Sequence, residues 1–146
     1  MARLALLSLL GAAFTLAAGP PARAEPATAF RVIVNQANPA TRLDKHFVAD
    51  AFLKKRTRWD DDRAIQPVDL GERSGTRGAF SRDILGRDVV SVRRYWAQLV
   101  FSGRGVPPRE LATENDVIKF VATHSGAIGY VTAGAALAGV KVLEVE

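Results

Sequence analysis

The chain has 146 residues, of which 24% are charged, and its 20 Lys and Arg residues against 15 Asp and Glu give a formal net charge of +5. It contains no cysteine, which excludes disulfide bonds, thiolate metal sites and a lipid-modified cysteine. The basic excess is mild, whereas nucleic-acid binding calls for a basic stripe, so no nucleic-acid partner is expected.

Residues 1–24 have the pattern of a cleavable secretory signal. Arg3 supplies the charged start, residues 4–18 are largely apolar, and Ala22-Arg23-Ala24 fits the A-x-A cleavage rule. The apolar run is shorter than the ~20 residues that span a bilayer as a helix. We therefore expect cleavage after Ala24 and a periplasmic protein with no integral membrane segment and a net charge of +3, because two arginines leave with the signal. A retained membrane anchor is the alternative.

The first part of the exported chain predicts a strand followed by a helix. A Pro/Ala-rich leader occupies residues 25–29, and residues 30–146 fit a single domain. The apolar centre of the segment 30–35 is continuous rather than alternating, which is typical of a strand covered on both faces. Thr41 with Asp44 resembles a capping box, and it predicts a helix that runs to about Lys54.

The second part predicts helices between further strands. The helix predicted over 89–101 has apolar residues at i, i+3, i+7, i+10 and i+11, and Thr113 resembles the cap of another helix. Alternation of strands with helices indicates an α/β fold with a largely covered sheet. The expected elements are an extended segment at 65–70, helices at 74–85, 89–101 and 114–123, strands at 127–132 and 140–145, and a small-residue connector at 133–139 with at most one helical turn.

The segment PVDLGERSGTRGAF, residues 67–80, carries the clearest functional pattern. A strand that ends in a polar turn and feeds a helix leaves several backbone N–H groups directed at one point. Ser74, Gly75 and Thr76 are small and allow an anion to approach, and Arg73 and Arg77 bracket the turn. This pattern predicts an oxyanion-binding turn. In the alternative interpretation Ser74 only caps the helix and the two arginines are solvated.

Nothing in the sequence assembles a catalytic site. The chain has only two histidines, His46 and His124, and neither forms a metal-ligand pair. No G-x-S-x-G elbow, phosphate-binding G-x-x-x-x-G-K or Gly-rich dinucleotide loop is present, and the spacing of Asp60–Asp62 does not fit a calcium loop. We expect a protein that is not an enzyme and holds no cofactor, while a triad of Ser74, His124 and an aspartate stays open.

Four segments together resemble the phosphate ABC-transporter substrate-binding proteins, which have the type II periplasmic binding fold. The family has two lobes that clamp the ligand, and the resemblance covers only the second lobe, over residues 30–136. It implies an α/β fold with one periplasmic-binding-protein-like lobe, in which a small mixed or parallel sheet is flanked by helices. The four segments are VIVNQANP (32–39), AFLKKRTRW (51–59), SGT (74–76) and HSGAIGYVTAGAA (124–136).

The resemblance also implies ligand-binding residues, with two departures from the family pattern. Phosphate binders of this family have an arginine four residues before the motif serine and an aspartate two residues before it. Here Leu70 and Glu72 stand at those positions. Glu72 would accept a proton from a protonated phosphate, and a nearby arginine would replace the missing one. The implied oxyanion-binding set is Ser74, Gly75, Thr76, Arg77, Arg73 and Glu72.

By the same resemblance, the chain would bind phosphate or a similar oxyanion and work with an ABC permease in phosphate uptake. Half of a clamp buries less ligand, so a homodimer would be one way to rebuild the cleft. A second hypothesis is an interaction module that docks on another envelope protein and binds no small ligand. A third is a hydrolase that uses Ser74.

Overall fold

The structure is a computed structural model that describes residues 29–146. The predicted signal peptide and most of the predicted leader lie outside the described residues. Within residues 29–146 no helix is long and apolar enough to cross a bilayer. The elements are β1 (Phe30–Asn35), β2 (Arg42–Leu43), α1 (Lys45–Phe52), β3 (Gln66–Leu70), α2 (Gly75–Asp83), α3 (Val89–Phe101), β4 (Arg109–Leu111), α4 (Glu114–Thr123), β5 (Ala127–Thr132) and β6 (Val140–Val145).

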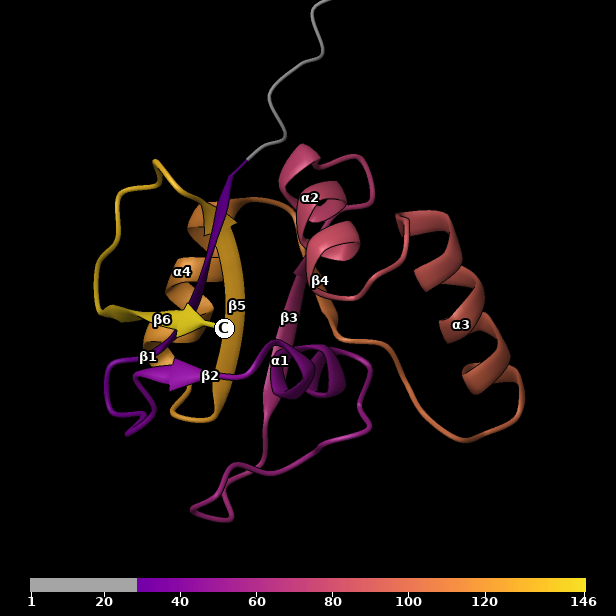
Figure 1. The fold of residues 1–146 in the computed structure, drawn as a ribbon, viewed down its shortest axis with the longest axis horizontal. Coiled ribbons are helices and arrows are strands. Elements are labelled where there is room, and N and C mark those ends of the chain that lie inside the picture. Colours follow the sequence, from indigo (N-terminus) through magenta and orange to yellow (C-terminus); the bar gives the residue numbers. More distant parts are fainter. Residues whose placement is uncertain (1–28) are drawn as a thin grey trace, which may run out of the picture.

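The strands form one mixed six-stranded sheet in the order β2-β6-β1-β5-β3-β4. β1 runs antiparallel to both of its neighbours, β5 and β6. β3 runs parallel to β4 and β5, and β2 runs parallel to β6. The α/β class and the mixed sheet flanked by helices are therefore confirmed (Figure 1).

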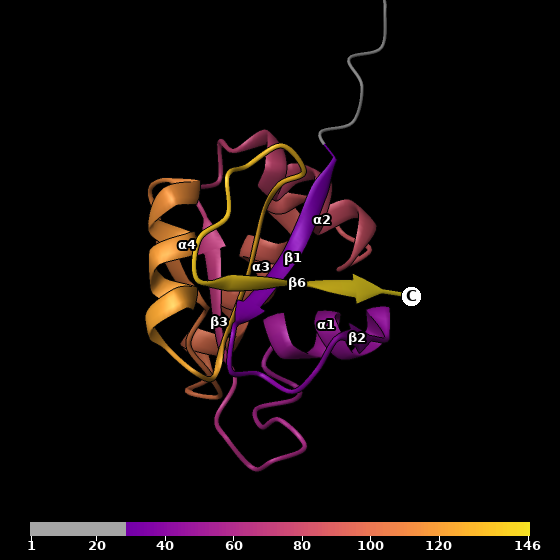
Figure 2. The same ribbon diagram turned by 90° about the vertical axis from the view of Figure 1, so that its left-hand side faces the viewer.

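Helices cover both faces of the sheet. α4 packs on one face, and α1 and α2 pack on the other (Figure 2). α3 lies beyond α2, at the edge of the molecule (Figure 1). Because β1 lies between these two layers, Val32, Ile33 and Val34 are all at most 2% exposed, which explains its continuous apolar sequence.

The centre of the core is built around β5. The ring of Tyr130 stacks on Phe80 of α2, with centroids 3.9 Å apart and planes 6° apart. On the other face Gly129 lets α4 approach closely, since a Cβ atom there would lie 2.7 Å from a methyl group of Val117 and 3.1 Å from one of Val68. Two adjacent residues of β5 thus join the α2 layer and the α4 layer to the same sheet.

The first helix begins later and ends earlier than the sequence pattern predicts. Asp44 is its N-cap and accepts a hydrogen bond from the backbone N–H of His46 at 2.6 Å, so the prediction that Thr41 caps this helix is wrong. Residues 42–43 are extended because they pair with β6. At the other end Lys54 has φ +53°, a left-handed conformation that stops the helix.

Two further predictions differ from the structure. The residues after Pro108 form a short strand, β4, which pairs with β3 and which the sequence pattern does not indicate. The connector 133–139 forms a turn and an irregular segment rather than a helical turn. The caps Ser74 and Thr113 are confirmed, because each side chain accepts a hydrogen bond from a backbone N–H in the first turn of its helix.

Candidate ligand-binding site

A cavity of about 490 Å³ opens where β3 and β4 end. Both strands run parallel, so their carboxyl ends lie together, and the loop that leaves β3 leads directly into α2. Ligands in α/β proteins commonly bind at the carboxyl ends of parallel strands. The cavity is lined by Gly71, Glu72, Arg73, Ser74, Glu110 and Ala112.

Ser74 places the N-terminus of α2 at this cavity. Its backbone is extended, with φ −69° and ψ 126°, and its Oγ accepts a hydrogen bond from the backbone N–H of Arg77 at 3.3 Å. The first N–H groups of a helix have no acceptor inside the helix. Within residues 29–146, no acceptor is found for the N–H groups of Gly75 and Thr76. The helix end therefore offers backbone donors and a partial positive charge beside the cavity.

The side chain of Thr76 is engaged inside the fold. Its Oγ1 donates a hydrogen bond to Oε1 of Glu114 at 2.9 Å. Glu114 also accepts from the backbone N–H of Thr132 at 3.1 Å and from its hydroxyl at 2.8 Å. The hydroxyl of Thr76 thus ties α2 to α4 and β5, which leaves the backbone N–H as the part of Thr76 that can serve a ligand.

Arg77 turns into the protein rather than into the cavity. The residue is only 6% exposed. Its Nη1 donates to the carbonyl oxygen of Leu70 at 2.5 Å and to Oε2 of Glu110 at 2.6 Å, and its Nη2 lies 3.2 Å from Oδ2 of Asp69. Arg77 therefore fixes Glu110, which lines the cavity, while its own guanidinium lies beneath the turn.

Asp69 and Tyr130 complete this buried network. The hydroxyl of Tyr130 donates to Oδ1 of Asp69, which also accepts from the backbone N–H of Leu70 at 3.0 Å. Burial raises the pKa of Asp69 above its ordinary value, and the Arg77 cation opposes part of that rise. Burial also raises the pKa of Tyr130, so the phenol remains a donor. The network lies beneath the turn that joins β3 to α2 and holds it in place. Glu110 is the one ionisable group of the network that is exposed to solvent.

Of the six predicted residues, Glu72, Arg73 and Ser74 line the cavity, whereas Gly75, Thr76 and Arg77 are not among its lining residues. Glu72 is exposed and accepts a hydrogen bond from Nη1 of Arg93 on α3 at 3.2 Å. Arg73 is exposed and lines the cavity with Ser74. Sequence reasoning missed Glu110, because it belongs to the strand β4 that the pattern did not indicate. Its only sequence signal is a carboxylate in a segment that follows two prolines.

The structure places Ser74 and His124, two members of the catalytic triad considered above, far apart. The first residue of β5 pairs with the first residue of β3, so His124, which precedes β5, lies at the end of the sheet opposite Ser74, which follows β3. Nδ1 of His124 lies 2.8 Å from the carbonyl oxygen of Phe120. Among residues 29–146 no group of three or more His, Cys, Asp or Glu residues is arranged to hold a metal ion. Asp60 and Asp61 pair with arginines instead.

A family model described as "PBP superfamily domain" matches residues 27–144. The chain belongs to this family. The family resemblance predicted from the sequence is confirmed at this level. No curated protein sequence matches the chain.

Solved structures show the same fold. A phosphate transport receptor of ABC type from Vibrio cholerae is 21% identical with a TM-score of 0.62, and the match covers 80% of this chain and 46% of that one. A phosphate ABC transporter substrate-binding protein from Clostridium perfringens, with bound phosphate, is 22% identical with a TM-score of 0.63 and coverages of 80% and 44%. A phosphate-binding protein from Stenotrophomonas maltophilia is 21% identical with a TM-score of 0.59 and coverages of 81% and 39%. The chain thus spans less than half the length of these proteins, as a single lobe does.

Proposed function

We propose that this chain binds phosphate, or a closely similar oxyanion, at the N-terminus of α2. The observation that carries the proposal is the cavity lined by Arg73 and by Ser74, the N-cap of α2. The next two N–H groups of the helix, those of Gly75 and Thr76, have no acceptor within residues 29–146. An anion at such a position is stabilised by the backbone donors, the helix dipole and the guanidinium together. The solved structures of similar fold whose titles name phosphate support the same ligand.

Ser74 can serve the helix and the ligand at once. Its oxygen accepts the hydrogen bond from the backbone N–H of Arg77, while its own O–H hydrogen remains available as a donor. In this proposal the ligand contacts are therefore the hydroxyl of Ser74, the N–H groups of Gly75 and Thr76, and the guanidinium of Arg73. Arg77 acts through Glu110 rather than by direct contact.

Two carboxylates in the same cavity favour an oxyanion that carries a proton. Glu72 and Glu110 each accept from an arginine, which reduces their repulsion toward an anion. A carboxylate can contact an oxyanion favourably only when the oxyanion brings a proton to share, because an ionised carboxylate is solely an acceptor. Phosphate retains a proton near neutral pH and sulfate does not, so we propose that the site prefers phosphate to sulfate.

Calorimetry with the purified protein tests this ligand and its selectivity. We expect phosphate to bind more tightly than sulfate, and Glu110→Gln to reduce that difference, because an amide can donate a hydrogen bond to either anion. Arg73→Ala should weaken both anions alike. Equal affinity for phosphate and sulfate in the wild type would contradict the assignment of the carboxylates, and no binding of any oxyanion would contradict the proposed function itself.

A wider role is proposed from the predicted signal peptide and from the single lobe. We propose that the chain is secreted to the periplasm after cleavage following Ala24. It would serve an ABC-type phosphate permease without catalysing a reaction. A second copy of the chain would face the open cavity. Mass spectrometry of the exported protein should find Glu25 as its first residue. Light scattering with and without phosphate measures whether a homodimer forms, and a monomer in both conditions would remove the dimer from the proposal.

A second candidate function is an envelope interaction module that binds no small ligand. Two predicted ligand side chains, Thr76 and Arg77, are engaged inside the fold, and Leu70 stands where the family has an arginine. These observations favour a lobe that has kept its structure without its ligand. Recovery of a stoichiometric envelope partner by a chain that gives no calorimetric signal with oxyanions would support this candidate over the first.

A further inference from the structure

Large apolar side chains are exposed mainly in one short part of the described chain. Five large hydrophobic residues are exposed within residues 29–146, and four of them lie between residues 90 and 106. Phe101 is 96% exposed, Val106 64%, Val100 51% and Val90 45%. The fifth, Val142, is 39% exposed and lies on β6. Three of these side chains lie on α3 and Val106 lies in the loop that follows it, and clustered exposed apolar side chains of this kind mark an interaction surface.

Val90 and Phe101 share the outer face of α3, whereas Val100 lies on the flank of the helix and Val106 lies in the loop that follows it. Val92 and Trp96 are buried and attach the helix to the domain, and the hydroxyl of Tyr95 donates to the carbonyl oxygen of Leu53 at 2.9 Å. Val90 and Phe101 are eleven residues apart, which places them on the same face, opposite the buried pair. Since α3 lies at the edge of the molecule, this face is an outer surface (Figure 1).

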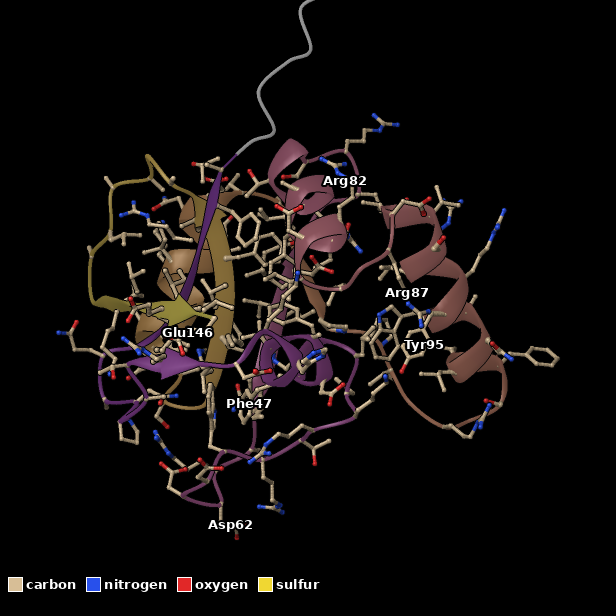
Figure 3. The ribbon with its side chains drawn as sticks, in the orientation of Figure 1. Phe47, Asp62, Arg82, Arg87, Tyr95 and Glu146 are labelled. Atoms are coloured by element: carbon tan, nitrogen blue, oxygen red, sulfur yellow. The ribbon has the colours of Figure 1, made fainter. Side chains whose placement is uncertain are left out.

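The same surface carries an excess of positive charge, although one of its arginines, Arg93, is paired with Glu72. Residues 84–108 contain four arginines and a single carboxylate, Asp88, which is occupied as the N-cap of α3. Figure 3 shows Arg87 beside Tyr95, and the guanidinium lies 5.4 Å from the centre of that ring. Arg94 lies four residues after Val90, within the apolar stripe itself. All four arginines are exposed: Arg87, Arg93, Arg94 and Arg104.

We propose that the outer face of α3 and the loop 102–106 dock on a membrane surface that contains anionic lipid. The exposed apolar side chains would enter the boundary between headgroups and acyl chains, and the arginines would contact lipid phosphates. α3 has 13 residues and lies at the edge of the molecule (Figure 1), with Val90 and Phe101 at the two ends of its outer face, so this face is accessible to a flat layer. The proposal does not depend on the ligand of the α2 cavity.

The charge pattern argues against a second copy as the occupant. Pairing of two identical α3 surfaces would bring two groups of four arginines together, of which, within residues 29–146, only Arg93 has a carboxylate partner, Glu72, on each side. Juxtaposed like charges cost free energy at an interface. A lipid surface supplies the opposite charge at every position, which makes it the better electrostatic partner for this helix.

Sedimentation with vesicles tests the proposal. The purified protein is mixed with vesicles of phosphatidylcholine and phosphatidylglycerol, and with vesicles of phosphatidylcholine alone. We expect binding to the anionic vesicles that weakens with salt. Phe101→Ser should lower the partition coefficient about tenfold or more, because a fully exposed phenyl group is the largest apolar contribution on this face. Arg94→Gln should weaken binding to the anionic vesicles only.

Val142→Ser is the matched control, since it removes an exposed apolar side chain from β6, away from α3, and it should leave vesicle binding unchanged. The side chain of Phe101 is too exposed for its loss to impair folding, which circular dichroism checks. Absence of binding to anionic vesicles, or equal binding by the wild type and Phe101→Ser, would overturn the proposal. So would a dimer in light scattering that Phe101→Ser dissociates, because a second copy would then cover the face.

Discussion

Nη2 of Arg77 lies 3.2 Å from Oδ2 of Asp69, and both side chains are at least nine-tenths buried directly beneath the turn that leads into α2. The pair joins the last part of β3 to the first turn of the helix, and Arg77 extends the connection to Glu110 on β4. A turn that is supported from below in this way keeps the helix end in a fixed position beside the cavity.

Loss of the buried cation should destabilise the protein strongly. Arg77→Met leaves the carboxylate of Asp69 buried without its partner, which costs about 3–5 kcal/mol in comparable cases. Arg73→Met changes an exposed arginine four residues earlier and should alter stability by less than about 0.5 kcal/mol. Urea unfolding measures both values. Equal midpoints for the two variants would show that the Asp69–Arg77 pair does not stabilise the fold.

Asp69 should also give stability a characteristic dependence on pH. Its pKa is raised in the folded state by burial, so between its ordinary value of 3.8 and the raised value the folded protein binds more protons than the unfolded chain. The contribution of Asp69 to the free energy of unfolding therefore falls as pH rises through this window. Relative to Asp69→Asn, the wild type should lose stability from about pH 4 upward. A stability difference that is constant with pH would contradict the raised pKa.

Gly129 should not tolerate even a methyl group. A Cβ atom at this position would meet methyl groups of Val117, Val68 and Val121 at 2.7, 3.1 and 3.3 Å. Overpacking of this kind costs about 1–3 kcal/mol, so Gly129→Ala should lower the thermal midpoint. Gly134→Ala is the control, since nothing lies within 4 Å of its added methyl group. A Gly129→Ala protein as stable as Gly134→Ala would mean that α4 can move away from the sheet without cost.

The hydroxyl of Thr76 should matter for stability and not for ligand binding. Its hydrogen bond to Glu114 is partly buried, and Thr76→Val leaves one acceptor site of that carboxylate unfilled, which costs about 1 kcal/mol. The variant keeps the backbone N–H of Thr76, which is the proposed ligand donor, so oxyanion affinity should change less than twofold. Calorimetry and urea unfolding of the same preparation measure the two effects. Loss of binding without loss of stability would instead assign the hydroxyl to the ligand.

Local signals in the sequence predict most of the helices. The helix 89–101 is found with the predicted bounds, because its apolar period is regular and spans thirteen residues. Ser74 and Thr113 are caps because each side chain accepts a hydrogen bond from the backbone N–H three residues further along the chain. Thr41 fails as a cap because its neighbours pair with β6, a strand one hundred residues further along the chain.

Contacts between distant segments explain what the sequence could not indicate. β4 has three residues and exists because β3 lies beside it, so no local pattern marks it. The direction of Arg77 is set by Glu110, thirty-three residues away. The structure explains the residue types in the segment AIGYV, which carries the family resemblance. Gly129 lets α4 approach the sheet, and Tyr130 donates a hydrogen bond to Asp69 and stacks on Phe80. That segment therefore belongs to the core of the fold and is not among the residues that line the α2 cavity.

The central claim is that backbone N–H groups at the start of α2 bind the oxyanion, and Gly75→Pro tests it most directly. Proline is favoured at the first position of a helix, and Ser74, with ψ 126°, already has the extended conformation that a following proline requires. The substitution therefore removes one N–H donor while the fold is retained.

Phosphate is titrated by calorimetry into the wild type, into Gly75→Pro and into Arg82→Ala, a control that changes an exposed arginine at the other end of α2. We predict saturable binding to the wild type and to Arg82→Ala, and an affinity about tenfold or more lower for Gly75→Pro, since hydrogen bonds to charged groups contribute about 1.5–3 kcal/mol. The same phosphate affinity in Gly75→Pro and the wild type would contradict the account.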